Sequence, residues 1–403
     1  MMSQSRDISQ NGGAPDGDGV GPHPSFIKVA NPYIFEQQIR SALAAIGVTE
    51  QKEDSIRLQG VHYIDNTRKA LQLPVRTFNT AVVYYHKFRL VHADTEYMWA
   101  DAAAAALFLA CKVEDTLKKS REVLCAAWNL KLPSSEHLSP DDPVFEQPSK
   151  TVVGLERLML ESASFDFRTR HPQELVIKLV KQLEGPMETL GRMSFNMSID
   201  LYRTFAPLKQ TSATMAIACI ELTARLLNLT TDSDMDRVVG PNGINLEAWF
   251  TTRGAIMETL LDLLDLYTHH RHATIVGPNF TIDNYVAIRI VLNKEATASK
   301  LARYTHWYER PDGASNGATN NGSKHQAVSS VVLGAEQNSN SPAISTTPMA
   351  GAQSRVGERG KEGTVRFMLS AERARGEKEV VAKYFAPDEY EEYEEEVDVP
   401  IDE

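Results

Sequence analysis

The sequence predicts an all-α protein built from two tandem helical repeats, with polar segments at both ends. From about Ile27 to Trp307 the chain is rich in Leu, Ala, Val and aromatic residues at helical spacing. The alternation of β-branched residues that marks strands is nearly absent there. Hydrophobic residues make up 42% of the 403 residues, which is enough for a sizeable core. The third observation is an internal repeat.

The repeat joins two segments that align without gaps at an offset of 117 residues. In each copy an alanine-rich helix containing Ala-Cys follows, at Ala110-Cys111 and at Ala218-Cys219. Two tandem helical units of about 100 to 130 residues therefore follow, each with its own core. The residues identical at the first offset are Phe78, Asn79, Tyr85 and Phe88 with Phe195, Asn196, Tyr202 and Phe205.

Capping residues support several of the helices. Pro74 stands just before one of them, and Asp94 or Thr95 can cap the next. The expected helices are Tyr33–Ile46, Asp54–Leu71, Val75–Phe88, Tyr97–Glu114, Ser120–Leu130, Val152–Phe165, Gln173–Glu184, Met193–Ala206, Gln210–Asn228, Leu246–His269 and Ile282–Tyr308.

The helix Tyr97–Glu114 is expected at the centre of the first unit. Five alanines follow Asp101 in succession, and the next residues are apolar as far as Cys111, so every face is small or apolar. A helix of this kind is buried among other helices. Lys112 ends the apolar run, and a lysine is costly to bury. We therefore expect Lys112 to reach solvent or to meet a carboxylate.

The net charge of −11 is unevenly distributed. Ten acidic residues and no Lys or Arg lie between Asp388 and Glu403, which leaves −1 for the rest of the chain. A nearly neutral body argues against direct nucleic-acid binding. Composition predicts disorder for residues 1–26 and for a linker at 309–363. Residues 364–403 are expected to hold a partner-binding segment, with a weakly helical solvated stretch as the alternative, and an acidic tail.

Other classes of function lack their signatures. No apolar run is long enough to span a membrane, and the polar N-terminus has no apolar signal segment. Cys111, Cys125 and Cys219 are expected to be buried reduced thiols, which suits the cytosol or nucleus. The histidine cluster His269, His270 and His272 lacks metal-ligand spacing. No catalytic centre, cofactor site or metal site can be assigned.

With these features in place, the chain resembles the cyclin family. The resemblance extends from about Asp54 to Tyr267 and depends on Arg57, Phe78 to Phe88, Leu107 to Thr116, and the stretch from Leu155 to Phe167. It implies an N-terminal cyclin box with a preceding helix at 27–170 and a C-terminal box at 171–308.

Within the family, the sequence is most similar to transcriptional cyclins. His171-Pro172 and the Lys118-Lys119 pair resemble the K, L, T and C types. Phe78 to Leu90 and Phe205 to Thr211 most resemble the fungal cyclin subunits of kinases that phosphorylate the C-terminal domain of RNA polymerase II.

The resemblance implies a regulatory role rather than an enzymatic one. Cyclins push a mobile helix of a cyclin-dependent kinase inward, which forms the Lys–Glu ion pair of the kinase. By the family match, Lys112 and Glu156 contact the kinase, and Leu109, Val113 and Glu114 adjoin them. Lys112 follows Ala110-Cys111, and the residue that follows Ala218-Cys219 in the second repeat is Ile220. An apolar residue is expected there if the second repeat lacks the contact. The alternative for Lys112 and Glu156 is an intramolecular surface pair worth about 0–1 kcal/mol.

The implied setting is nuclear, with a cyclin-dependent kinase as partner, a third kinase-complex subunit as a further candidate, and the polymerase tail as substrate. The alternatives are another transcriptional cyclin or a cyclin-fold transcription factor or adaptor.

One family feature is missing. The substrate-docking patch of cell-cycle cyclins corresponds to Ile56, Gln59, Gly60 and Tyr63, and Gln59 and Gly60 replace large apolar residues there.

Overall fold

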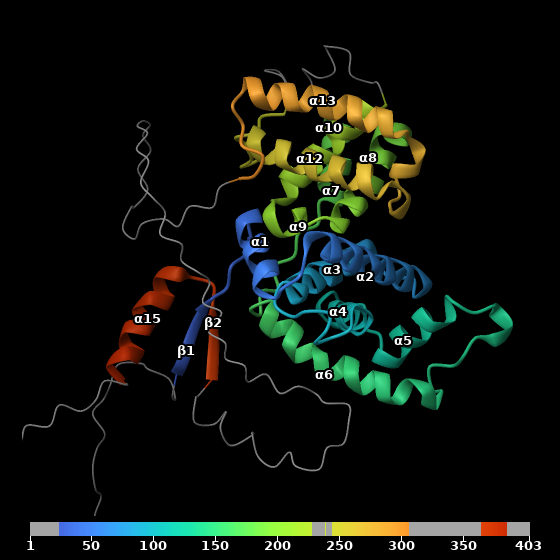
Figure 1. Ribbon diagram of the computed structural model, residues 1–403, viewed down its shortest axis with the longest axis vertical. Coiled ribbons are helices and arrows are strands. Elements are labelled where there is room, and N and C mark those ends of the chain that lie inside the picture. The colour runs from blue at the N-terminus through green and yellow to red at the C-terminus, as the bar shows by residue number, and fades with distance from the viewer. Residues whose placement is uncertain (1–23, 228–237, 239–243, 306–363, 385–403) are drawn as a thin grey trace, which may run out of the picture. The chain divides into compact units, whose positions relative to one another are not determined.

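The computed structural model describes residues 24–227, 238, 244–305 and 364–384 (Figure 1). The chain divides into two units: one contains the described residues 31–305, and the other combines residues 24–30 with 364–384. Most of the segments predicted to be disordered, and the acidic tail, lie outside the described residues. The all-α prediction is confirmed for the larger unit.

The first repeat is built around α4 (Trp99–Val113), as its alanine content predicts. Every residue from Ala102 to Cys111 is buried, and α2, α3, α5 and α6 pack around the helix (Figure 1). The N-cap residue of α4 is Met98 rather than Asp94 or Thr95, although the carboxylate of Asp94 accepts a hydrogen bond from the amide of Trp99, the first residue of the helix, at 2.7 Å. The other helices of this repeat are α1 (Glu36–Ala45), α2 (Glu50–Ala70), α3 (Val75–Arg89), α5 (Ser120–Asn129) and α6 (Glu146–Ser162).

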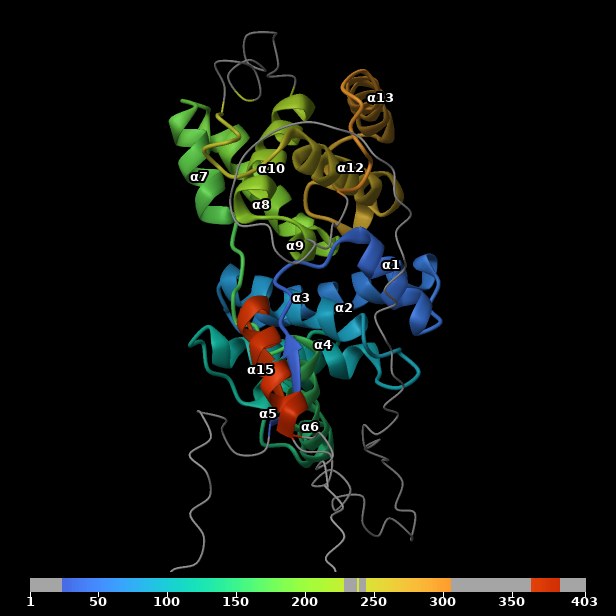
Figure 2. The ribbon, with the colours of Figure 1, turned by 90° about the vertical axis from the view of Figure 1, so that its left-hand side faces the viewer.

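The second repeat has the same plan around α10 (Ser212–Leu226). The alanine-rich stretch of α10 is buried, and Ile220, the counterpart of Lys112, lies inside this second core. The predicted division at residue 170 falls between α6 and the first helix of this repeat. The surrounding helices are α7 (Gln173–Gln182), α8 (Arg192–Asp200), α9 (Ala206–Lys209), α12 (Arg253–His269) and α13 (Ile282–Ala298) (Figure 2).

Several helices end or begin elsewhere than the sequence predicts. The helix expected from Val152 begins at Glu146, and the helix expected to reach Ala206 ends at Asp200. The helix expected from Leu246 starts only at Arg253, because the Thr252 hydroxyl caps it by accepting from the amide of Ala255 at 3.2 Å. The helix expected to reach Tyr308 ends at Ala298. Lys300 has a positive φ of 52°, which turns the chain back toward the rest of the unit.

The two repeats are joined by aromatic and polar contacts. The rings of Phe78 and Tyr202, identical positions in the repeat, lie 5.9 Å apart. Tyr202 and two of its neighbours belong to the first core. The helix α1 also joins both repeats: Ile39 and Leu43 pack in the first core, and Glu36 is paired with Lys209 of the second repeat at 3.0 Å.

His86 at this junction makes the stability depend on pH. The ring is fully buried, and its Nε2 donates to the carbonyl oxygen of Tyr202 at 2.9 Å. Burial, with repulsion from Arg57, lowers the pKa of His86 from 6.5 to about 3. Below about pH 6.5 the unfolded chain therefore binds a proton that the folded chain does not, and acid favours unfolding.

We expect this histidine to lower the free energy of unfolding by about 1.2 kcal/mol between about pH 7 and pH 5.5. Urea titrations of the protein and of His86→Gln at both pH values measure the effect. The substitution should reduce the pH dependence by that amount, whereas His62→Gln on the exposed face of α2 should leave it unchanged. An equal pH dependence in all three proteins would contradict the argument.

The smaller unit contains a parallel sheet that the sequence did not reveal. The strands β1 (Pro24–Val29) and β2 (Thr364–Met368) pair in parallel, and α15 (Ala371–Tyr384) packs beside β1 (Figure 2). Residues 24–26, expected to be disordered, are therefore part of a strand. The stretch from Thr364, for which a weak helix was an alternative, begins as a strand and continues as a helix.

Candidate functional site

The centre of the site is an ion pair between the end of α4 and the middle of α6. Nζ of Lys112 donates to both carboxylate oxygens of Glu156, at 2.7 and 2.8 Å. The Lys112 side chain is 42% exposed and that of Glu156 19%. The sequence expectation that Lys112 either reaches solvent or meets a carboxylate is confirmed in both respects.

The position of Lys112 follows from the helix that carries it. Ten consecutive buried residues precede it, and Lys112 is the first residue after them to leave the core. Its ammonium group also lies 4.3 Å from the centre of the Phe108 ring, one turn earlier. Two of its three N–H donors are used by Glu156, and one remains for a partner. A helix of a binding partner would therefore find an N–H donor on Lys112 beside the carboxylate acceptor of Glu156.

Glu114 adjoins this pair, but other groups hold its carboxylate. It accepts a hydrogen bond from the Thr80 hydroxyl at 2.6 Å and lies 3.7 Å from Arg76 and 3.6 Å from His171. Burial lowers the pKa of His171, and Glu114 partly opposes that shift. Glu114 thus links α3, the end of α4 and the segment before α7. Its predicted contact with a kinase stays a prediction.

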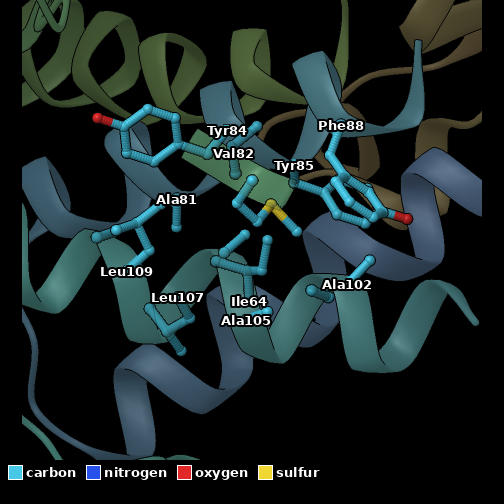
Figure 3. Packing of buried hydrophobic residues seen from close by; sticks show 14 of the residues in the cluster. Ile64, Ala81, Val82, Tyr84, Tyr85, Phe88, Ala102, Ala105, Leu107 and Leu109 are labelled. Carbon is cyan, nitrogen blue, oxygen red and sulfur yellow. The ribbon is translucent and has the colours of Figure 1, made fainter. Parts of the chain in front are cut away.

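The structure corrects one predicted contact. Leu109 is 3% exposed and packs in the first core, where Figure 3 shows it beside Ala81 of α3. It stabilises the repeat rather than reaching a partner, because α4 is buried on every side at that level. Val113 is half-buried and packs against the same core, so only part of its side chain can contribute to a surface.

Two exposed apolar residues near the pair were missed. Leu117, in the turn after α4, is 74% exposed, and Val153 on α6 is 48% exposed. Val153 lies three positions before Glu156 and therefore on the same helix face. A hydroxyl contact of 2.7 Å between Ser120 and Ser149 holds the segment after Leu117 against α6. The i, i+3 spacing to Glu156 could have identified Val153 from the sequence.

The substrate-docking patch of cell-cycle cyclins has no apolar counterpart on α2. Ile56 and Gly60 are buried, and Gln59 is exposed and bonded to Ser55. Tyr63 is half-buried and packs edge-on against Trp99 at 6.3 Å. Three of the four positions that would form the patch, Ile56, Gly60 and Tyr63, therefore support the core of the first repeat, and the fourth is polar.

Other kinds of site have no candidate in the part of the chain that the structure describes. No group of His, Cys, Asp or Glu there could hold a metal ion. None of the described helices is long and apolar enough to cross a membrane. Cys111, Cys125 and Cys219 are all free and buried. Burial raises the pKa of the Cys111 thiol to about 11 and so keeps it protonated.

Comparison with known proteins identifies the family. The family described as the cyclin N-terminal domain matches residues 32–168. CTD kinase subunit beta of Schizosaccharomyces pombe is 31% identical over 269 residues, which cover 66% of this chain and 76% of that protein. The chain belongs to the cyclin family. The predicted family is thereby confirmed, and this cyclin is a regulatory subunit rather than an enzyme.

Further relatives match shorter parts of their own sequences. Human cyclin-T1 is 30% identical over 194 residues, which cover 48% of this cyclin but only 27% of cyclin-T1. Human cyclin-K is 30% identical over 183 residues, covering 45% of this cyclin and 31% of cyclin-K.

A solved structure shares the fold. A chain in the crystal structure of the yeast RNA polymerase II CTD kinase complex CTDK-1 superposes with a TM-score of 0.62 at 19% identity. The superposition covers 88% of this cyclin and all of that chain. The fold of two tandem cyclin boxes is therefore confirmed.

Proposed function

We propose that this cyclin binds and activates a cyclin-dependent kinase that phosphorylates the C-terminal domain of RNA polymerase II, and that it acts in the nucleus. The similarity to an S. pombe protein named as a subunit of a CTD kinase supports the substrate. The observation that carries the proposal is the Lys112–Glu156 pair, which is partly exposed and lies at the end of the buried stretch of α4.

The pair suits a kinase helix because it offers both hydrogen-bonding polarities. The free N–H of Lys112 can donate to a backbone carbonyl at the end of that helix, and Glu156 has lone pairs left to accept from a backbone or side-chain donor. Val153, on the same face of α6 as Glu156, supplies exposed apolar surface beside it, and Leu117 is exposed in the turn after α4. Seating the kinase helix against this surface stabilises its inward, active position. A third kinase-complex subunit stays a prediction.

Alanine substitution of both residues tests this interface. We expect Lys112→Ala combined with Glu156→Ala to weaken kinase binding by about 100-fold and to lower activity accordingly, because two charge-assisted contacts are lost. Stability should change by less than about 1 kcal/mol, since the pair lies at the surface. Titration calorimetry measures the binding, and a kinase assay on a polymerase-tail peptide measures the activity. Lys150→Ala with Glu146→Ala, another exposed pair on α6, is the matched control.

The charge-swapped protein separates a kinase contact from an internal ion pair. Lys112→Glu with Glu156→Lys can remake the pair but presents the opposite charges to the kinase. Activation should remain lost in this variant although stability is normal. Wild-type activation by the swapped protein would show that the two residues serve only each other.

A further inference from the structure

The outer face of α13 carries an apolar surface that no described residue covers. The helix is anchored in the second core by Tyr285 and Leu292, which are fully buried. On the opposite face Val286, Ile290 and Val291 are 40%, 51% and 52% exposed. Helices at a protein surface normally carry polar residues there. Contiguous exposed apolar surface is a common feature of interaction sites.

The centre of this face has the spacing of a helix-pairing seam. Asp283, Ala287, Ile290 and Lys294 follow one another at intervals of four, three and four residues, and all four are exposed. This is the spacing of the contact positions in a two-helix coiled coil. Ala287 is small, so a partner helix can approach closely at that point. Val286 and Val291 flank the seam on its two sides.

The two charges on the seam are arranged so that each would meet the opposite charge of a second copy. Asp283 and Lys294 lie at equal distances from a point between Ile288 and Arg289, and so do Ala287 and Ile290. A second copy of α13 packed antiparallel about that point would place Asp283 of each copy opposite Lys294 of the other. Ala287 would face Ile290, and on either side of the seam Val286 would lie beside Val286 of the other copy and Val291 beside Val291. Neither the side chain of Asp283 nor that of Lys294 has an ion pair or hydrogen bond with any other described residue.

We propose that α13 is a homodimerisation surface, on which two copies of this cyclin pair antiparallel about a two-fold axis. The contact is isologous, so it closes after two copies. Figures 1 and 2 show α13 at the end of the larger unit away from α4 and α6, so the dimer leaves the Lys112–Glu156 surface accessible. This proposal does not depend on the identity of the kinase.

The size of the contact sets the expected affinity. A helix of 17 residues is about 25 Å long at 1.5 Å per residue. One pair of such helices is at the small end of specific interfaces, so we expect a dissociation constant of about 10 µM. Sedimentation velocity on the full chain from about 1 to 200 µM should therefore show a reversible monomer–dimer equilibrium.

Charge reversal tests the pairing without disturbing the core. Lys294→Glu or Asp283→Lys alone places like charges opposite each other at both ends of the seam, and each should weaken the dimer about tenfold or more. The double variant Asp283→Lys with Lys294→Glu restores opposite charges and should recover the dimer. Lys178→Glu makes the same charge change on the exposed face of α7 and should have no effect.

For the chain alone, three outcomes would overturn the proposal: a chain that stays monomeric up to about 200 µM, a dimer insensitive to Lys294→Glu, or no recovery in the double variant. Circular dichroism of each variant must show an unchanged helix content, so that a lost dimer is not confused with a lost fold. Repeating the measurement on the reconstituted kinase complex distinguishes a second copy from another subunit. A complex with one copy of the cyclin, unchanged in mass by Lys294→Glu, would also contradict the dimer.

Discussion

Replacing Lys209 with methionine is expected to lower the free energy of unfolding by about 3–5 kcal/mol. The Lys209 side chain is 2% exposed, and its ammonium group lies 3.0 Å from Glu36, 2.9 Å from Glu258 and 2.6 Å from Asp262. Burial opposes the charge on Lys209, but the three carboxylates hold its pKa above the usual value. Methionine would fill the space and leave three carboxylates together without that cation.

The variant should recover part of its stability in acid. Burial alone raises the pKa of Asp262, and Lys209 together with Arg303 holds it below the usual value. Without the lysine, these carboxylates bind protons more readily in the folded state. The loss in Lys209→Met should therefore be smaller at about pH 5 than at pH 7, as measured by urea unfolding.

Two further variants complete this experiment. Lys150→Met removes an exposed lysine that is paired with Glu146 and should change stability by less than about 1 kcal/mol. Lys209→Arg keeps the charge, and its free energy of unfolding should lie between those of the unsubstituted protein and Lys209→Met. A loss below about 1 kcal/mol in Lys209→Met would mean that the ion cluster does not hold α1 and the second repeat together.

The Gly60→Ala protein is expected to be less stable by about 1–3 kcal/mol, although alanine normally favours a helix over glycine by about 1 kcal/mol. Gly60 is buried in the middle of α2, and a Cβ there would overlap the ring of Tyr85. Tyr85 is fully buried, and its hydroxyl donates to the carbonyl oxygen of Ile56 at 3.2 Å. The ring cannot move away without breaking this bond or displacing the core.

Thermal and urea unfolding of Gly60→Ala measure this cost. Gly254→Ala is the matched control, because a Cβ at Gly254 would meet only the Thr252 hydroxyl at 3.9 Å. It should be neutral or slightly stabilising. A Gly60→Ala protein as stable as the control would show that Tyr85 repacks freely and that close approach of α2 and α3 is not required.

Gly60 also explains why the substrate-docking patch is missing. The docking patch of cell-cycle cyclins has a large apolar residue at this position. Such a residue has no room beside Tyr85. The same close contact that stabilises the first repeat thus removes the docking surface. This agrees with the similarity to CTD kinase subunit beta and to cyclin-T1 and cyclin-K.

The candidate site was predicted unevenly. Lys112 could be found because it ends an apolar run, and Glu156 because the family resemblance supplies a carboxylate partner. For Leu109, three positions before Lys112, the family match predicts an apolar contact with the kinase. Only the packing of α4 on all sides shows that it points into the core. The exposure of Leu117 and Val153 likewise depends on which faces the neighbouring helices cover.

The sequence alone determined the helical class, the two repeats, the buried alanine-rich helices and the emergence of Lys112 from one of them. These features follow from periodicity and from the cost of burying charge, which act over a few turns of chain. The tertiary structure decided the partners of Lys209, the close approach of Gly60 to Tyr85 and the pairing of β1 with β2. Each of these joins residues far apart in the chain, because burial and hydrogen bonding are satisfied in space rather than along the sequence.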